Sequence, residues 1–265
     1  MTRQATEALR VDDIPVTRLD GVAVQELSRD DEDAMEFSVI TVPDRDGALP
    51  LPMGRGADVF VLDGDVALDD GTPIPAGSYA FVAGLGEGRS VRHTAGARYF
   101  VGTGAAGDGP GAADEVIDPE TVAWQVRVQE NAEYTRGGRS IGLVKFLRVD
   151  EHSKTTIGIG AMWPESGLDC AEHHEQLDEV LNLRGDMLLR DLDGSPVVAD
   201  GLSYCWRPSR SVHLPKYSHR GNLTFFRNMK VLWSEHGAAT FIPVEEWPEM
   251  VDEYRAGLSV ADATR

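Results

Sequence analysis

The stretch that decides the fold occurs twice in this chain. Residues 58–65 read DVFVLDGD and residues 179–186 read EVLNLRGD, an offset of 121 positions. Each copy is a short run rich in Val and Leu that ends in Gly-Asp, which is typical of a buried strand running into a tight turn. A repeated strand and turn predict an internally duplicated β structure.

The similarity between the two copies continues along the chain in the same order. DGTPI at 70–74 corresponds to DGSPV at 193–197, GSY at 77–79 to GLSY at 201–204, and GARYFV at 96–101 to GNLTFF at 221–226. The offset changes only between about 121 and 125 positions, which a loop insertion of a few residues explains. Several matches in one order therefore predict two homologous β domains.

The rest of the sequence fits an all-β protein with one helix at its end. Apolar runs of strand length recur every 10 to 20 residues, and residues 102–121 are rich in Gly, Ala, Asp and Pro, as in a linker. Residues 243–263 have the apolar spacing of an amphipathic helix. We predict an N-terminal arm (1–36), a first barrel (37–104), a linker (105–121), a second barrel (122–240), and a C-terminal helix and tail (241–265).

Composition narrows the range of partners. The 265 residues include 44 acidic and 25 basic side chains, a formal net charge of −19. A surface of this charge repels nucleic-acid phosphates and anionic membranes, so we expect neither nucleic acid nor a membrane as a partner. No run of about 18 to 20 apolar residues and no apolar leader are present, which predicts a cytoplasmic location. Cys170 and Cys205 form no CxxC pair and are expected to be free thiols.

Two short segments contain the residues that suit a metal site. Residues 172–179 read EHHEQLDE and immediately precede or begin the second copy of the repeated strand, and residues 207–213 read RPSRSVH. Residues i and i+2 of a strand point to the same side, so two ligands from one strand and one from a neighbour can hold a metal and leave positions open. Two histidines and a carboxylate suit iron(II), manganese, nickel or zinc.

These segments resemble the two motifs of the cupin superfamily, G-x5-H-x-H-x3-4-E-x6-G and G-x5-P-x-G-x2-H-x3-N. In the first motif, five residues lie between Gly167 and His173, and Gly185 is the closing glycine. Pro208 and His213 match the second motif, in which Arg210 occupies a glycine position. The second stretch also resembles bicupins related to the sensor domain of the ChrR anti-sigma factor and to acetylacetone-cleaving dioxygenases. The resemblance implies two tandem cupin barrels, each a double-stranded β-helix, closed by a C-terminal helix.

The expected H-x-H is absent, so two registers of the first motif remain open. Counting back from Gly185 selects Glu172, His174 and Asp178, whereas counting forward from Gly167 selects His173, Glu175 and Glu179. One bulge moves every side chain to the other face, so the sequence does not choose between them. The candidate metal ligands are His173, His174, Asp178, Glu179 and His213.

The first repeat serves as an internal control. The positions that correspond to 172, 173, 174 and 178 are Leu51, Pro52, Met53 and Ala57, none of which is a histidine or carboxylate. We therefore predict that the first barrel holds no metal.

Several other residues near the motifs are candidates for catalysis. Glu175, Glu179 and His219 can move protons, and Arg207 or Arg227 can bind a carboxylate. The remaining polar and aromatic candidates in these segments are Tyr204, which we include among the catalytic residues, and Trp163, Trp206, Lys216 and Tyr217.

The resemblance implies a metal-dependent enzyme that acts on a small organic substrate. With iron(II), the preferred metal, it would be a dioxygenase; with zinc, manganese or nickel, it would be an isomerase, cyclase or lyase that activates a carbonyl or enolate. The alternatives are a small-molecule or metal-sensing module without turnover and a metal-free acid–base cupin such as an epimerase. Such barrel pairs pack within a chain or across a dimer, so a homodimer is also among the expectations.

Overall fold

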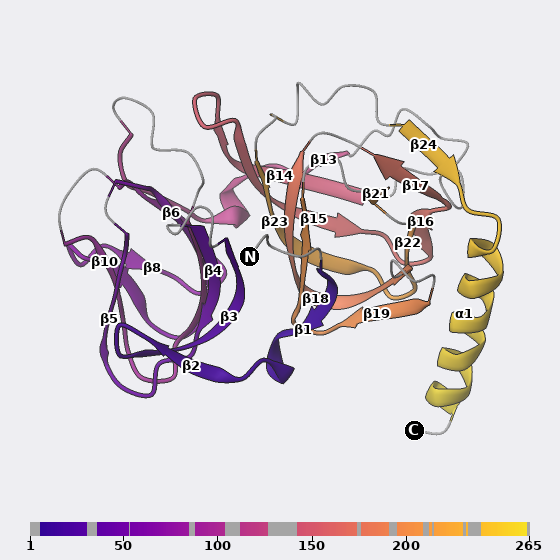
Figure 1. Ribbon diagram of the computed structural model, residues 1–265, viewed down its shortest axis with the longest axis horizontal. Coiled ribbons are helices and arrows are strands. Elements are labelled where there is room, and N and C mark those ends of the chain that lie inside the picture. Colours follow the sequence, from indigo (N-terminus) through magenta and orange to yellow (C-terminus); the bar gives the residue numbers. More distant parts are fainter. Residues whose placement is uncertain are drawn as a thin grey trace. The chain divides into compact units, whose positions relative to one another are not determined.

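The computed structural model describes residues 6–30, 36–52, 54–84, 88–103, 112–126, 142–173, 176–190, 195–208, 212–213, 215–229, 232 and 240–263. The chain forms two compact units (Figure 1). Unit 1 contains Met1–Arg3, Val11–Ala123 and Asp150–Lys154, and unit 2 contains Gln4–Arg10, Trp124–Val149 and Thr155–Arg265. The fold is all-β, as predicted, and each unit has two antiparallel sheets that face each other.

Unit 1 pairs a seven-stranded sheet with a four-stranded sheet. The larger sheet has the order β12 (Glu115–Ile117), β9 (Tyr79–Val82), β6 (Ala57–Asp63), β11 (Arg98–Thr103), β4 (Glu36–Thr41), β3 (Val22–Asp30) and β2 (Val16–Leu19). The smaller sheet has the order β5 (Gly47–Pro50), β10 (Ser90–His93), β7 (Val66–Leu68) and β8 (Pro73–Ile74). Val59, Val61 and Tyr99 from the larger sheet share one core with Leu49 and Val91 from the smaller sheet, so the core lies between them.

Unit 2 repeats this topology. Its main sheet has the order β1 (Thr6–Arg10), β20 (Ser203–Arg207), β18 (Leu177–Arg190), β23 (Asn222–Met229), β15 (Thr155–Met162), β14 (Gly142–Asp150) and β13 (Gln125–Val126). The second half of β18 bends into the opposite sheet, where it pairs with β19 (Pro196–Asp200) and β22 (Lys216–Ser218); β22 also pairs with β16 (Ser166–Leu168). The strand order therefore matches that of unit 1.

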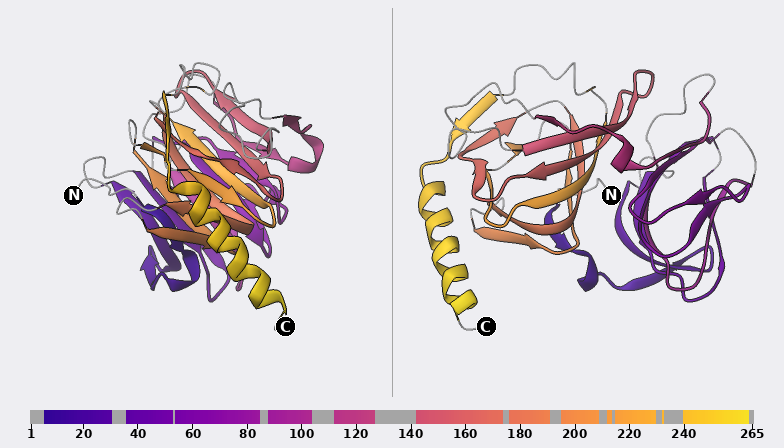
Figure 2. Two further views of the ribbon diagram at one scale, coloured as in Figure 1. Left: turned by 90° about the vertical axis from the view of Figure 1, so that its right-hand side faces the viewer. Right: turned by 180° about the vertical axis from the view of Figure 1, so that it is seen from behind.

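Unit 2 carries two further elements. A three-stranded sheet has the order β21 (Val212–His213), β17 (Cys170–His173) and β24 (Thr240–Pro243), and the described strands of unit 1 include no counterpart. The predicted C-terminal helix is present as α1 (Trp247–Ala263). Its residues Trp247 and Val251 pack on Leu188 and Tyr217, and Figure 2 shows α1 beside the sheet that contains β19 and β22. No helix in the described part of the chain is long and apolar enough to cross a membrane.

The Gly-Asp of each repeated stretch forms a turn that requires glycine. Gly64 has φ +82° and Gly185 has φ +83°, a left-handed conformation that side chains disfavour. A Cβ on Gly64 would lie 2.6 Å from Ala97 Cα, and one on Gly185 would lie 2.0 Å from Gly221 O. The same turn is therefore packed against the same neighbouring strand in both units.

The edges of the units recruit segments that the sequence analysis treated as arm and linker. Residues 16–30 form β2 and β3 of unit 1. Within residues 105–121, β12 pairs with β9, and a 3-10 turn, η2 (Pro119–Thr121), is capped by Asp118. The N-terminal strand β1 pairs with β20 in the same way. Each main sheet thus gains an edge strand from outside its repeat, which covers an edge that would otherwise be unpaired.

Candidate metal and substrate site

The backbone of unit 2 brings the two motif segments together. On β17 and β21, Glu172 stands opposite His213 and His173 stands opposite Val212. For Glu172, His173 and His213 the structure describes the backbone alone, and the predicted candidates His174 and Glu175 lie outside the described residues. The two segments are thus adjacent strands, as a shared metal requires.

The alternation of β18 separates Asp178 from Glu179. Asp178, Val180 and Asn182 lie on one face, and Glu179 and Leu181 lie on the other. The first face is the interior of unit 2, because Val180 and Asn182 line a recess together with Met187 and Ala199 from the opposite sheet. The homologous positions in unit 1, Ala57, Val59 and Val61, likewise belong to the core between its sheets.

A buried polar cluster surrounds Asp178 on the interior face. Asn228 Nδ2 donates to Asp178 Oδ1 and, at 3.3 Å, to Gln176 Oε1. Arg207 on β20 stands directly opposite Asp178. All four side chains are more than nine-tenths buried. We call Gln176, Asp178, Arg207 and Asn228 the interior polar cluster. Burying charged groups costs free energy unless partners compensate for the lost water, so such a cluster is unusual in a barrel core.

The first unit has no such cluster at the same register positions. Ala57 stands opposite Val82 and Thr103 in unit 1, where unit 2 has Asp178 opposite Arg207 and Asn228. The duplicated fold therefore does not need these polar side chains for its stability. Their presence in unit 2 alone marks this end of the barrel as the candidate site.

Glu179 belongs to a different contact on the opposite face of β18. Tyr204 Oη donates to Glu179 Oε1 at 2.5 Å, and Arg227 Nη1 forms an ion pair with Glu179 Oε2. The three side chains are at most 2% exposed. Unit 1 repeats half of this arrangement, because Tyr79 Oη donates to Asp58 Oδ1 at 2.7 Å. A contact present in both units is part of the duplicated framework, and it engages two of the predicted catalytic residues, Glu179 and Tyr204.

His219 lies where α1 meets the smaller sheet. Its Nδ1 lies against Glu165 Oε1, and its backbone N–H donates to Asp186 Oδ2 at 3.1 Å. Tyr217 Oη donates to Glu165 Oε2 at 2.8 Å, and Arg255 of α1 pairs with the same oxygen at 2.9 Å. His219 and Tyr217 are thus engaged in docking the helix.

The remaining candidates do not belong to the interior polar cluster. Trp206 stands opposite Glu179 in the pairing of β20 with β18, and Trp163 is exposed. Lys216 is half-buried on β22 opposite Leu168. Cys170 and Cys205 are buried and form no disulfide bond. The described side chains alone hold no group of three His, Cys, Asp or Glu residues close enough to share a metal.

The candidates predicted from the sequence do not include three polar residues of the barrel interior: Gln176, Asn182 and Asn228. The signal that reveals Asn182 and Asn228 is the repeat alignment itself, which sets them against Val61 and Thr103 of unit 1. A polar residue in one copy at a position that is apolar or small in the other is a mark of function rather than of fold.

Comparisons with solved structures identify the architecture. A candidate dioxygenase from Nostoc punctiforme superimposes with a TM-score of 0.66 at 17% identity, over 90% of this chain and 86% of that chain. A cupin 2 conserved barrel domain protein from Leptotrichia buccalis gives a TM-score of 0.57 at 11% identity, over 86% and 98% of the two chains. A point mutant of Bacillus subtilis oxalate decarboxylase gives 0.55 at 10% identity, over 92% and 81%. No family model and no curated protein matches the sequence.

Proposed function

Because the chain has the cupin fold, we propose that unit 2 is a metal-dependent enzyme domain that acts on a small organic substrate. The observation that carries the proposal is the interior polar cluster, with Asp178 opposite Arg207 and Asn228 where unit 1 has Ala57, Val82 and Thr103. The solved structures with the same fold include a candidate dioxygenase and an oxalate decarboxylase, the second of which acts on a small substrate by name.

The proposed metal ligands are His213, His174 and Asp178, with Glu172 as a further carboxylate. Asp178 suits this role because it is buried on the interior face and because Asn228 holds one of its oxygens, as hydrogen-bonded ligands commonly are. Glu172 suits it because it stands opposite His213. Glu179 suits it less, since its two oxygens engage Tyr204 and Arg227 on the other face. The second register, His173, Glu175 and Glu179, is therefore the weaker of the two.

A divalent ion held there would supply Lewis acidity toward a carbonyl or enolate oxygen or, as iron(II), a redox centre. The chain's own residues would do the rest. The Arg207 guanidinium would attract an anionic oxygen of the substrate, and Asn228 would keep the Asp178 carboxylate in one orientation. Glu175 would move a proton at the substrate carbon or oxygen. Tyr204 and His219 take no part in this scheme, because their contacts lie elsewhere.

Metal content tests the proposal directly. We expect about one divalent metal per chain in protein purified without chelator, and less than a tenth of that in His213→Ala and in Asp178→Leu. Exposed His152 lies outside the site, so His152→Ala is the matched control and keeps the metal. Iron would direct the search for a substrate toward oxygen chemistry, and zinc, manganese or nickel toward carbonyl activation.

The register is tested by Glu179→Gln, which keeps the metal if Asp178 is the ligand. Loss of metal from Glu179→Gln but not from Asp178→Leu would select the second register. Wild-type protein that remains metal-free after anaerobic incubation with iron(II) would contradict the metal proposal and favour acid–base catalysis without metal. Metal binding without turnover of any carbonyl or oxygen-dependent substrate would favour a sensor.

A further inference from the structure

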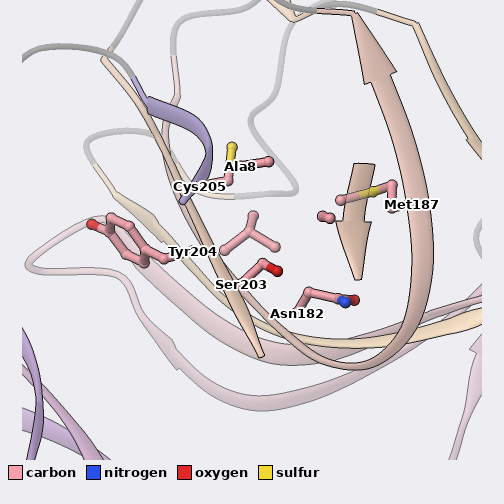
Figure 3. A pocket seen from close by; sticks show the side chains of 8 residues that line it. Ala8, Asn182, Met187, Ser203, Tyr204 and Cys205 are labelled. Carbon is pink, nitrogen blue, oxygen red and sulfur yellow. The ribbon is translucent and has the colours of Figure 1, made fainter. Parts of the chain in front are cut away.

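A narrow recess lies in the interior of unit 2, two strand positions beyond Asp178. It is bounded by Val180 and Asn182 on β18, by Ser203 and Cys205 on β20, and on the remaining sides by Met187, Ala199 and Ala8. Figure 3 shows Asn182 and Ser203 together at one end and Cys205 with Ala8 at the other, while the Tyr204 ring points away. In this conformation the recess is too narrow to hold a water molecule.

The recess lies at positions where the two units carry different residues. Met187 pairs with Ala199 in unit 2 just as Val66 pairs with Ile74 in unit 1. By strand pairing, Ala199 therefore stands where unit 1 has the larger Ile74, although the sequence match sets Ile74 against Val197, because the hairpin of unit 2 is longer. Val61, the counterpart of Asn182, and Ile74 are fully buried members of the unit 1 core. Unit 1 thus has two buried apolar side chains, Val61 and Ile74, at the positions where unit 2 has a polar residue and a smaller one.

Asn182 ends the recess with an unused hydrogen-bond acceptor. Its Nδ2 donates to Gly201 O at 2.8 Å and to Gly185 O at 3.4 Å, which fixes the amide, because a flipped amide would turn its oxygen toward two carbonyls. Its Oδ1 is buried without a hydrogen-bond partner, and the residue is 2% exposed. An unpaired buried acceptor costs free energy that a ligand's donor can recover.

Strand β1, which contributes Ala8 to the wall of the recess, pairs irregularly with its neighbour. The pairing of β1 with β20 shifts register between Thr6 and Leu9, a bulge that places Ala8 beside the recess. In unit 1, β12 pairs with β9 without a shift, and Val116 packs against the core. Bulges of this kind are common beside binding sites, where they re-aim side chains.

We infer that the recess binds a mainly apolar group bearing one hydrogen-bond donor, an alcohol O–H or an amide N–H, which donates to Asn182 Oδ1. The apolar part would lie between Val180, Met187 and Ala199. Entry requires the Met187 thioether to move aside, which its three rotatable bonds allow. The inference rests on the recess and on the comparison of the two units, and it does not depend on a metal in the barrel.

Two isomeric probes test the role of the donor. Butan-1-ol and methyl propyl ether have the same atoms, but only the alcohol can donate a hydrogen bond. In protein with 13C-labelled methionine methyl groups, we expect butan-1-ol to shift the Met187 signal saturably, with that signal assigned from Met187→Leu. The ether should bind about fivefold to tenfold more weakly, which is the usual effect of one hydrogen bond.

Variants that copy unit 1 into unit 2 test the location. Ala199→Ile fills the recess as Ile74 fills unit 1, and Asn182→Val removes the acceptor as Val61 does. We expect no saturable shift in Ala199→Ile and equal affinity for alcohol and ether in Asn182→Val. Val198→Ile is the matched control, because the neighbouring side chain of β19 is exposed, and it should bind like the wild type. His213→Ala should also bind normally, which separates this test from that of the metal.

Three results would overturn the inference. The first is a Met187 shift that rises in proportion to probe concentration without saturating. The second is equal binding of the two isomers by the wild-type protein. The third is unchanged binding in Ala199→Ile, with the wild-type fold confirmed by its amide spectrum.

Discussion

At the scale of single residues, the neighbours Asp178 and Glu179 are in opposite environments. Asp178 accepts a hydrogen bond from the Asn228 amide inside the barrel and stands opposite Arg207, and Glu179 meets Tyr204 and Arg227 on the other face of the same strand. Both carboxylates are buried, so both depend on their partners for the free energy lost with their water shells. The consequences of losing a partner are therefore large and measurable.

Arg227→Met should lower the free energy of unfolding by about 3–5 kcal/mol, because it leaves the Glu179 carboxylate buried without its cation. Denaturant unfolding followed by fluorescence measures this change. Arg18→Met is the control, since Arg18 and Asp44 form an ion pair at the surface with both side chains more than half exposed. The control should leave the unfolding midpoint almost unchanged. Equal effects from the two variants would contradict a special cost of burial at Glu179.

His93 of unit 1 makes the stability depend on pH. Its Nδ1 lies 2.7 Å from Tyr99 Oη, and burial lowers the pKa of His93 below its ordinary value of 6.5, against the smaller opposing effect of the Asp46 charge. The unfolded chain therefore binds a proton more readily than the folded chain. The stability from neutral His93 is present above pH 6.5 and is lost as the pH falls below 6.5 through the lower folded pKa.

His93→Asn keeps a polar group near Tyr99 Oη and cannot titrate in this range. We expect this variant to show a flatter loss of stability than the wild type between about pH 6.5 and 5, measured by denaturant unfolding at each pH. His152→Asn changes an exposed histidine and should keep the wild-type slope. A wild-type slope in His93→Asn would show that other groups cause the pH dependence.

At the scale of elements, α1 is held by hydrogen bonds as well as by apolar packing. Tyr254 Oη donates to Asp186 Oδ2 at 2.8 Å, and the Asp186 carboxylate is completely buried. Burial alone would raise the pKa of Asp186, but hydrogen bonds from the Arg220 backbone, Tyr254 and the His219 backbone outweigh it and lower that pKa below 3.8. The charged form is therefore the one that the fold requires, and its contribution to stability is lost as the pH falls below 3.8.

Tyr254→Phe should release α1 without unfolding the sheets. The lost hydrogen bond to a charged group corresponds to about 1.5–3 kcal/mol. Hydrogen exchange should be faster in residues 247–257 and unchanged in β18. Tyr79→Phe removes a hydroxyl–carboxylate bond far along the chain in unit 1 and should leave exchange in α1 as it is. Unchanged exchange of α1 in Tyr254→Phe would mean that the packing of Trp247 and Val251 and the Arg255–Glu165 ion pair hold the helix without this hydrogen bond.

Edge strand β1 should be necessary for the order of its neighbour. A chain that starts at Val11 lacks β1, so the backbone of β20 loses the pairs that Leu9 and Arg10 make with Tyr204 and Ser203. We expect faster hydrogen exchange in β20, but not in β9, which β12 covers in unit 1. Equal protection of β20 in the shortened and full chains would contradict this role for β1.

The elements were predictable to the extent that their signals are local. The repeated run of Val and Leu before Gly-Asp identified β6 and β18, and the apolar spacing of Trp247, Val251 and Tyr254 identified α1. Strands β2 and β3 are an exception, because they form a local hairpin across Asp20 and Gly21 that the assignment of residues 1–36 to an arm overlooks. Strand β12 falls in the predicted linker, because what makes it a strand is its partner β9, which is distant in sequence. The local sequence of such an edge strand therefore says little about whether it will pair.

At the scale of the whole molecule, the duplication made the fold predictable but left the site incomplete. The sequence pointed to Asp178 and Arg207 through the motifs, yet it could not tell which carboxylate of the pair 178 and 179 faces inward, because a single bulge reverses the answer. Asn228 does not stand out in the sequence because it lies outside the two motifs, and Asn182 does not because it occupies an unspecified position of the first motif. Only the register of β18 with β23 and β20 shows that they line the same interior.

The large negative charge should also affect the molecule as a whole. With a formal net charge of −19, repulsion between carboxylates opposes the compact state, and dissolved salt screens it. We expect the melting temperature to rise by a few degrees between about 0.05 and 0.5 M sodium chloride. A melting temperature that falls over this range would show that ion pairs such as those of Arg89 with Asp69 and Asp114 outweigh the repulsion.

The position of β1 also has a consequence for synthesis on the ribosome. Leu9 pairs with Tyr204, so 195 residues must be translated before this strand meets its partner, which takes about 10–40 s at the usual rate of about 5–20 residues per second. During that time unit 1 can complete its sheets, because β12, the last of its described strands, is made long before β20. Strand β1 is therefore among the first segments to be synthesised, but it can pair only after β20 of unit 2 has been made.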